Sequence, residues 1–155
     1  MKLTKIITHL TSALIISFSA LTHAGHDTET DANDVILAGY DAVAYFTQGK
    51  PVEGSAKYTT SYNDAIYRFS SKQNRDTFNA DPTRYAPQYG GFCAYGMTFG
   101  KKFEIDGKAF EVVDGKLYVN ENQSVYKAWK KDVPTHLEQA NSQWPTVENT
   151  AANQL

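Results

Sequence analysis

The stretch "KYTTSYNDAIYRFSSKQNRDTFNADPTRY", residues 57–85, decides the fold, because a hairpin pattern is followed directly by a helical one. In its first half, the dipeptide Asn63-Asp64 separates two arms rich in aromatic and β-branched residues, which predicts a β-hairpin. In its second half, the spacing predicts a helix capped by Ser70 or Ser71. That helix must end before Pro82, since the residue preceding a proline is pushed out of the α region.

The same mixture of short hairpins and short helices continues on both sides of this stretch. In the segment "AFEVVDGKLYV" (109–119), side chains alternate in the pattern of a strand on both sides of Asp114-Gly115. This dipeptide is a strong two-residue turn signal, so the segment predicts a second β-hairpin. Further helices are predicted after a cap at Asp41, after Asp81, between Gly91 and Gly100, and on either side of Pro134. The fold class expected is α+β: a small single domain with two β-hairpins packed against several short helices.

The first 24 residues are typical of a secretory signal peptide. Lys2 and Lys5 precede an apolar run (10–21), and "THA" offers a cleavage point after Ala24. The run of about 12 residues is shorter than the roughly 20 that a membrane helix needs. We therefore expect a periplasmic or secreted protein with no stable membrane insertion after cleavage; a retained anchor is the alternative.

The predicted mature chain divides into three parts. Residues 25–34 are polar and acidic and are expected to be a flexible leader, residues 35–146 form the domain, and residues 147–155 form a flexible tail. Without Lys2 and Lys5, 13 basic residues face 17 acidic ones, a net charge of −4. This balance argues against a nucleic-acid partner, which rewards clustered Lys and Arg.

The glycine-rich stretch "GGFCAYGM" (90–97) holds the chain's only cysteine, Cys93, so no intrachain disulfide can form. Met97 follows four residues later, and in a helix this spacing places both sulfurs on one face. Thiolate and thioether are soft ligands that suit Cu(I), with His136 as a third donor, so copper or another soft metal ion is the candidate cofactor. The alternative is that Cys93 and Met97 simply fill space in the core.

Tyrosines offer a second kind of candidate site. Tyr40, Tyr89 and Tyr95 each adjoin a glycine, and amphipathic rings of this kind line ligand pockets. The alternative is that they lie at the rim of the core. The sequence has no phosphate-cradling glycine motif, no HExxH and no CxxC, so a binding role is favoured over a catalytic one.

Taken together, four segments resemble the YHS-domain family in the version found in small exported bacterial proteins. They are "GYDAVAYF" (39–46), "YRFSSKQNRDTFNADPTRYAPQYGGFCAYGM" (67–97), "VDGKLYVN" (113–120), and the spaced residues Trp129, Asp132, Ala140 and Trp144. The resemblance implies a compact α+β domain. It also implies a small metal-handling module, because relatives are fused to heavy-metal and copper-transporting ATPases.

This chain departs from the metal-handling relatives at two positions. There, the stretch after the second strand reads tyrosine-x-phenylalanine-cysteine-serine, with another cysteine a turn later. Here those positions are Ser70 and Asn74, so the soft-metal pair is absent. Two functions therefore stay open: an exported binding module with a soft-metal site near Cys93, or a module that binds a small molecule or protein and in which Cys93 is purely structural.

Overall fold

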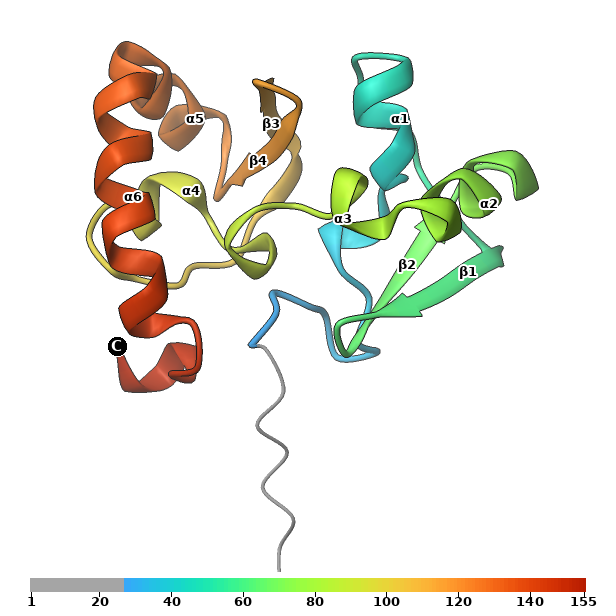
Figure 1. The fold of residues 1–155 in the computed structure, drawn as a ribbon, viewed down its shortest axis with the longest axis horizontal. Helices are drawn as coiled ribbons and strands as arrows, with labels where there is room; N and C mark the ends of the chain where they lie inside the picture. The colour runs from blue at the N-terminus through green and yellow to red at the C-terminus, as the bar shows by residue number, and fades with distance from the viewer. Residues whose placement is uncertain (1–26) are drawn as a thin grey trace, which may run out of the picture.

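The computed structural model describes residues 27–155, so the predicted signal peptide and the first two leader residues lie outside the described residues. The helices and strands in chain order are α1 (Ala42–Thr47), β1 (Ser55–Tyr62), β2 (Ala65–Phe69), α2 (Lys72–Ala80), α3 (Pro82–Tyr85), α4 (Ala94–Met97), β3 (Asp106–Val113), β4 (Lys116–Asn120), α5 (Gln123–Trp129) and α6 (Val133–Val147). Short 3₁₀ turns lie between several of them. Figure 1 shows β1 and β2 grouped with α1 to α3, and β3 and β4 grouped with α4 to α6.

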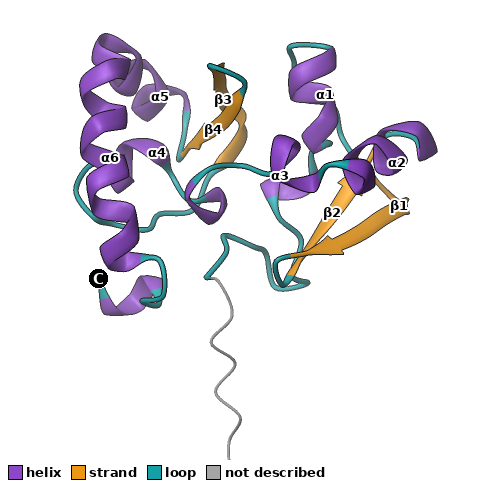
Figure 2. Ribbon diagram, viewed as in Figure 1, coloured by secondary structure: helices purple, strands orange, loops and turns teal. Residues whose placement is uncertain are grey.

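The strands form two separate antiparallel hairpins, β1–β2 and β3–β4 (Figure 2). Each hairpin turns through two residues, Asn63-Asp64 and Asp114-Gly115, and all four have positive φ. Positive φ at both central positions defines the type I′ turn, whose twist matches that of the flanking strands. Both predicted hairpins, and the α+β fold class, are confirmed.

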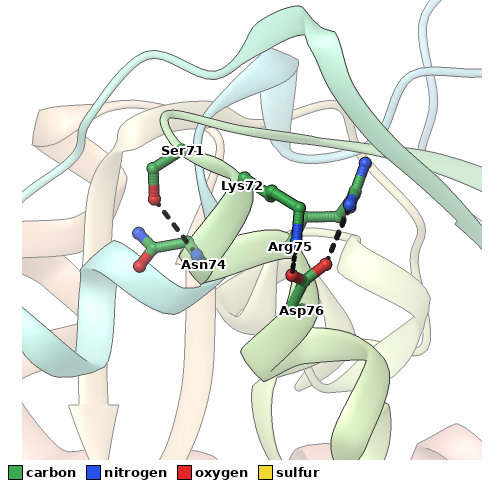
Figure 3. A network of polar contacts seen from close by, with 5 residues as sticks. All are labelled: Ser71, Lys72, Asn74, Arg75 and Asp76. Atoms are coloured by element: carbon green, nitrogen blue, oxygen red, sulfur yellow. Dashed lines mark hydrogen bonds and ion pairs between the residues drawn. The ribbon is translucent and has the colours of Figure 1, made fainter.

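Helices α1, α2 and α3 begin where the sequence predicts, after Asp41, Ser71 and Asp81. Ser71 caps α2 by accepting the Asn74 backbone N–H at 3.1 Å (Figure 3). In the next turn Lys72 pairs with Asp76 at 2.6 Å, but both side chains are substantially exposed, so the pair adds little stability. The helix ends at Ala80, before Pro82, for the steric reason given above.

Two hydrophobic cores meet at β4, which presents a different face to each. We call the cluster around α1, β2 and Phe78 the first core, and the cluster around Met97, Trp129 and α6 the second core. Leu117 and Val119 of β4 belong to the first core, and Tyr118 between them belongs to the second. Because successive side chains of a strand point to opposite faces, β4 joins the two cores into one domain.

The leader and the tail both contact the domain. In the leader, the Glu29 N–H donates to the Gly90 carbonyl at 2.9 Å, and the Asp34 carbonyl accepts the Ile66 N–H at 2.7 Å. In the tail, Leu155 packs against the second core. The flexibility expected for both segments stays a prediction, and the structure adds that each has specific contacts.

Within residues 27–155, no helix is both long enough and apolar enough to cross a membrane.

Candidate functional site

Cys93 is a fully buried cap of a short helix. Its sulfur accepts the Gly96 N–H at 3.4 Å, and its thiol donates to Asn120 Oδ1 at 3.7 Å. The same Asn120 oxygen accepts the Tyr95 N–H at 3.1 Å. Burial raises the pKa of the Cys93 thiol above its usual value, although nearby N–H groups act in the opposite direction. Burial therefore favours the neutral thiol over the thiolate that a soft metal binds.

The two other predicted metal ligands have contacts of their own. Met97 is fully buried in the second core. The His136 Nδ1 lies 2.7 Å from the Trp129 carbonyl oxygen, which can only accept, so this nitrogen carries the proton. The His136 ring stands edge-on to Tyr95, with 5.0 Å between centroids. In the described part of the chain, no three or more His, Cys, Asp or Glu side chains are grouped so that they could hold a metal ion.

Ser70 and Asn74, where metal-handling relatives carry cysteines, lie together on the buried carboxylate of Asp41. Asp41 Oδ2 accepts the Ser70 N–H at 2.8 Å, the Ser70 hydroxyl at 2.6 Å and the Asn74 side-chain amide at 2.7 Å. Asp41 Oδ1 accepts the N–H groups of Val43 and Ala44, which begin α1.

The Asp41 carboxylate is fully buried and has five hydrogen-bond donors. A buried charge is tolerated only with such a set of partners. Sequence reasoning found the cap at Asp41 but not its bonds to Ser70, which follows β2, and to Asn74 of α2, because those residues lie 29 and 33 positions away. At these positions the chain has a structural polar network in place of thiolates.

An aromatic cleft of about 340 Å³ lies between the first hairpin and α6. Four rings line it: Tyr62, Tyr67, Tyr89 and Trp144. The lining also includes Thr28 from the leader and Glu148 just beyond α6. We call this the Tyr89 cleft.

Only one of the three predicted ligand-binding tyrosines lines this cleft. Tyr40 packs against the first core, so closely to Gly107 that a Cβ there would lie 2.4 Å from the Tyr40 ring. Tyr95 packs on Phe99 and His136. The structure therefore separates the three residues, and it adds Tyr62, Tyr67 and Trp144, which the sequence did not predict as ligand-binding residues.

The backbone at Tyr89 is strained. Tyr89 has φ of 56°, a left-handed conformation uncommon for a bulky residue, and Gly90 and Gly91 continue it. The Tyr89 hydroxyl donates to Asn141 Oδ1 at 2.9 Å, and its ring lies 6.0 Å from that of Trp144. Burial raises the pKa of Tyr89, so the hydroxyl stays a donor at any ordinary pH.

Comparison with known families identifies part of this architecture. Residues 43–89 match the family model of the YHS domain, from α1 through the first hairpin to Tyr89. Over these residues the predicted resemblance to the YHS-domain family is confirmed. A search of curated proteins and a search of solved structures found no match.

Proposed function

We propose that this protein is an exported binding module that holds a small organic ligand in the Tyr89 cleft, with Cys93 as a structural residue. The observation that carries the proposal is the lining of the cleft by four aromatic rings from separate segments of the chain. Its volume of about 340 Å³ lies within the range of small-molecule sites, which are mostly apolar and enclosed.

The strain at Tyr89 supports this choice of site. A non-glycine residue in the left-handed region costs of order 1–3 kcal/mol and persists only where its surroundings hold it. Here Asn141 holds the hydroxyl while Tyr118 and Trp144 flank the ring. Such strain concentrates at binding and catalytic sites, and at Tyr89 its effect is to position an aromatic ring in the cleft wall.

The remaining lining indicates what kind of ligand fits. The side chains of Asn63 and Gln88 carry amides, and those of Thr28 and Thr83 carry hydroxyls. A few polar groups among aromatic rings favour a ligand with a planar or apolar body and a small number of hydrogen-bonding groups.

Export rests on the basic, apolar and small-residue pattern of the first 24 residues. It places the protein in the periplasm or outside the cell. A chain fused to an alkaline phosphatase reporter, which is active only where its disulfides form, tests this directly: activity in the periplasmic or secreted fraction is expected, and an inactive fusion retained in the cytoplasm would contradict it.

Soft-metal binding near Cys93 is the second candidate. One observation favours it: Cys93 and Met97 are the sulfur-bearing residues of the described chain, and they lie at the two ends of α4. The burial of the thiol and its donation to Asn120 Oδ1 argue against it.

A fragment screen by protein-observed NMR tests the cleft. Fragments that bind should shift the amide of Tyr89 and the indole of Trp144 in the labelled protein. Tyr62→Ala should weaken these fragments about two- to tenfold, the effect of losing one ring contact. Tyr58→Ala is the matched control, because Tyr58 lies on the same strand and packs against the first core but does not line the cleft. Fragments that shift residues elsewhere, or that lose equal affinity in both variants, would overturn the proposal.

A further inference from the structure

The leader contributes one residue to the lining of the Tyr89 cleft. Thr28 is among the lining residues, and the next residue, Glu29, donates its N–H to the Gly90 carbonyl at 2.9 Å. The approach to Gly90 is so close that a Cβ there would lie 2.6 Å from the Asp27 carbonyl oxygen. Only glycine allows this approach, so the cleft loop and the leader fit each other closely.

A buried lysine attaches the start of the leader. The Lys102 ammonium is fully buried and donates to Asp27 Oδ2 at 2.8 Å and to the carbonyls of Glu148 and Thr150 at 3.0 and 2.7 Å. An ammonium has three protons to donate, and here each has an acceptor. The ammonium also lies 5.4 Å from the ring of Trp144, which lines the cleft. Lys102 thus ties the leader, the end of α6 and the cleft wall together.

The Glu29 carboxyl lies in a place that disfavours its charge. Its Oε2 is buried and has no hydrogen-bond partner within the described chain, while the Ile105 N–H donates to the carboxyl. The charged groups that face it are acidic: Glu104, from the segment before β3, and Asp31, from the leader itself. Burial, followed by these two charges, raises the pKa of Glu29 to about 7.

Asp31 keeps its own charge because its environment is the opposite one. Its carboxylate accepts the N–H groups of Val35 and Asn33, and the positive charge of Arg68 adds a weaker attraction, so its pKa is lowered. The leader therefore holds one carboxylate that stays ionised, Asp31, close to one whose charge depends on the pH near neutrality, Glu29.

We propose that residues 27–31 are a strap that closes one side of the Tyr89 cleft, and that ionisation of Glu29 releases this strap. The proposal rests on the proposed function where it treats the cleft as a ligand site. An undocked Glu29 ionises near its ordinary value of 4.5, whereas the docked residue keeps its proton to about pH 7. Docking is therefore strongest below pH 4.5, weakens as the pH rises from 4.5 to 7, and is constant above. Ligand entry is therefore favoured above about pH 7, where the strap docks most weakly.

Amide hydrogen exchange of the full-length protein at pH 5.5 and pH 8.0 tests the strap without any ligand. After correction for intrinsic exchange rates, the protection factors of the Glu29 and Asp31 amides should fall by about 10- to 100-fold between the two pH values. The Met97 amide, which donates to the Cys93 carbonyl in the second core, should show no such fall. Equal protection of the strap amides at both pH values would overturn the proposal.

Charge-removing variants assign the effect to Glu29. Glu29→Gln keeps the shape of the side chain without its charge, so the strap should stay protected at pH 8.0. Glu104→Gln should reduce the fall, because it removes one of the two acidic neighbours. Asp34→Asn, an exposed substitution in the same segment, should change nothing. A fall that persists in Glu29→Gln would refute the role of Glu29.

The outcomes separate the two proposals. If the strap opens with rising pH but no fragment binds the cleft, the strap proposal stands and the ligand site is refuted. If fragments bind the cleft but the strap is insensitive to pH, the ligand site stands and the strap proposal is refuted.

Discussion

Asp41 and Cys93 are both fully buried side chains that cap short helices, yet their surroundings differ greatly. Asp41 caps α1 and has five hydrogen-bond donors drawn from α1, α2 and the residue after β2. Cys93 caps α4, and its sulfur makes one long bond to Gly96 and another to Asn120. A charge can be buried only with a full set of partners, whereas a thiol is readily buried as a small hydrophobic group. A lone cysteine can therefore be buried without a chemical role, whereas a buried carboxylate requires donors from several elements to be arranged around it.

The largest effect is expected from removing the Asp41 carboxylate. Asp41→Ala leaves the donors of Ser70, Asn74 and the α1 backbone unpaired, so the free energy of unfolding should fall by about 3–5 kcal/mol. Urea denaturation measures this.

Asp132→Asn is the control for Asp41. Asp132 caps α6 from an exposed position and accepts only the Thr135 N–H at 3.3 Å. Asparagine caps helices about as well as aspartate, so this variant should change the stability by less than about 0.5 kcal/mol. If Asp41→Ala lowers the free energy of unfolding no more than Asp132→Asn does, the buried network around Asp41 is not a main source of stability.

The second prediction restores thiolates where metal-handling relatives have them. The Ser70 hydroxyl and the Asn74 amide lie 3.4 Å apart, so cysteines at both positions would bring two sulfurs together. Ser70→Cys combined with Asn74→Cys should bind Cu(I) at least about 100-fold more tightly than the unsubstituted protein, because thiolates are soft ligands. Competition with a Cu(I) chelator measures this. Ser71→Cys with Asn74→Cys is the control, since the Ser71 hydroxyl accepts the Asn74 backbone N–H, whereas the Asn74 side-chain amide donates to Asp41 and Ser70.

The third prediction concerns Cys93 itself. Cys93→Ser keeps a donor and an acceptor at the cap, so the stability should fall by only about 1 kcal/mol and the Cu(I) affinity should stay the same. The chelator competition decides between the two candidate functions. A tenfold or greater loss of Cu(I) affinity would favour the metal site and contradict a purely structural Cys93.

Thiol reactivity provides an independent check on Cys93. Burial shields the sulfur and raises the pKa of the thiol, so less thiolate is present in the folded protein. At pH 8, alkylation by iodoacetamide should be at least about 100-fold slower in the folded protein than in urea. Rapid alkylation under native conditions would show that the thiol is accessible.

The smallest effect is expected at His136. His136→Ala removes the bond to the Trp129 carbonyl and should cost about 0.5–1 kcal/mol. His136→Asn places an amide donor near the same carbonyl and should recover part of that loss. Neither variant should change Cu(I) affinity, and a change in both would point to His136 as a ligand.

The sequence predicted the elements well because their signals are local. The turn Asp114-Gly115, the cap at Ser71 and the stop before Pro82 each depend on a few adjacent residues. The candidate site was predicted less completely: Tyr89 lines the cleft, but Tyr40 and Tyr95 belong to other surroundings. Adjacency to glycine is shared by all three, so it could not distinguish them.

By itself, the sequence determined the α+β class, the two hairpins with their turns, the caps at Asp41 and Ser71 and the YHS resemblance over residues 43–89, because periodicity and capping act over a few residues. Only the tertiary structure decided that Ser70 and Asn74 serve a buried carboxylate, and that Glu29 meets Glu104 across 75 positions of chain. Such contacts depend on how distant segments pack, and the burial they create sets whether a carboxyl keeps its charge or a thiol its proton. The chemistry of a side chain is encoded locally, but its environment is not.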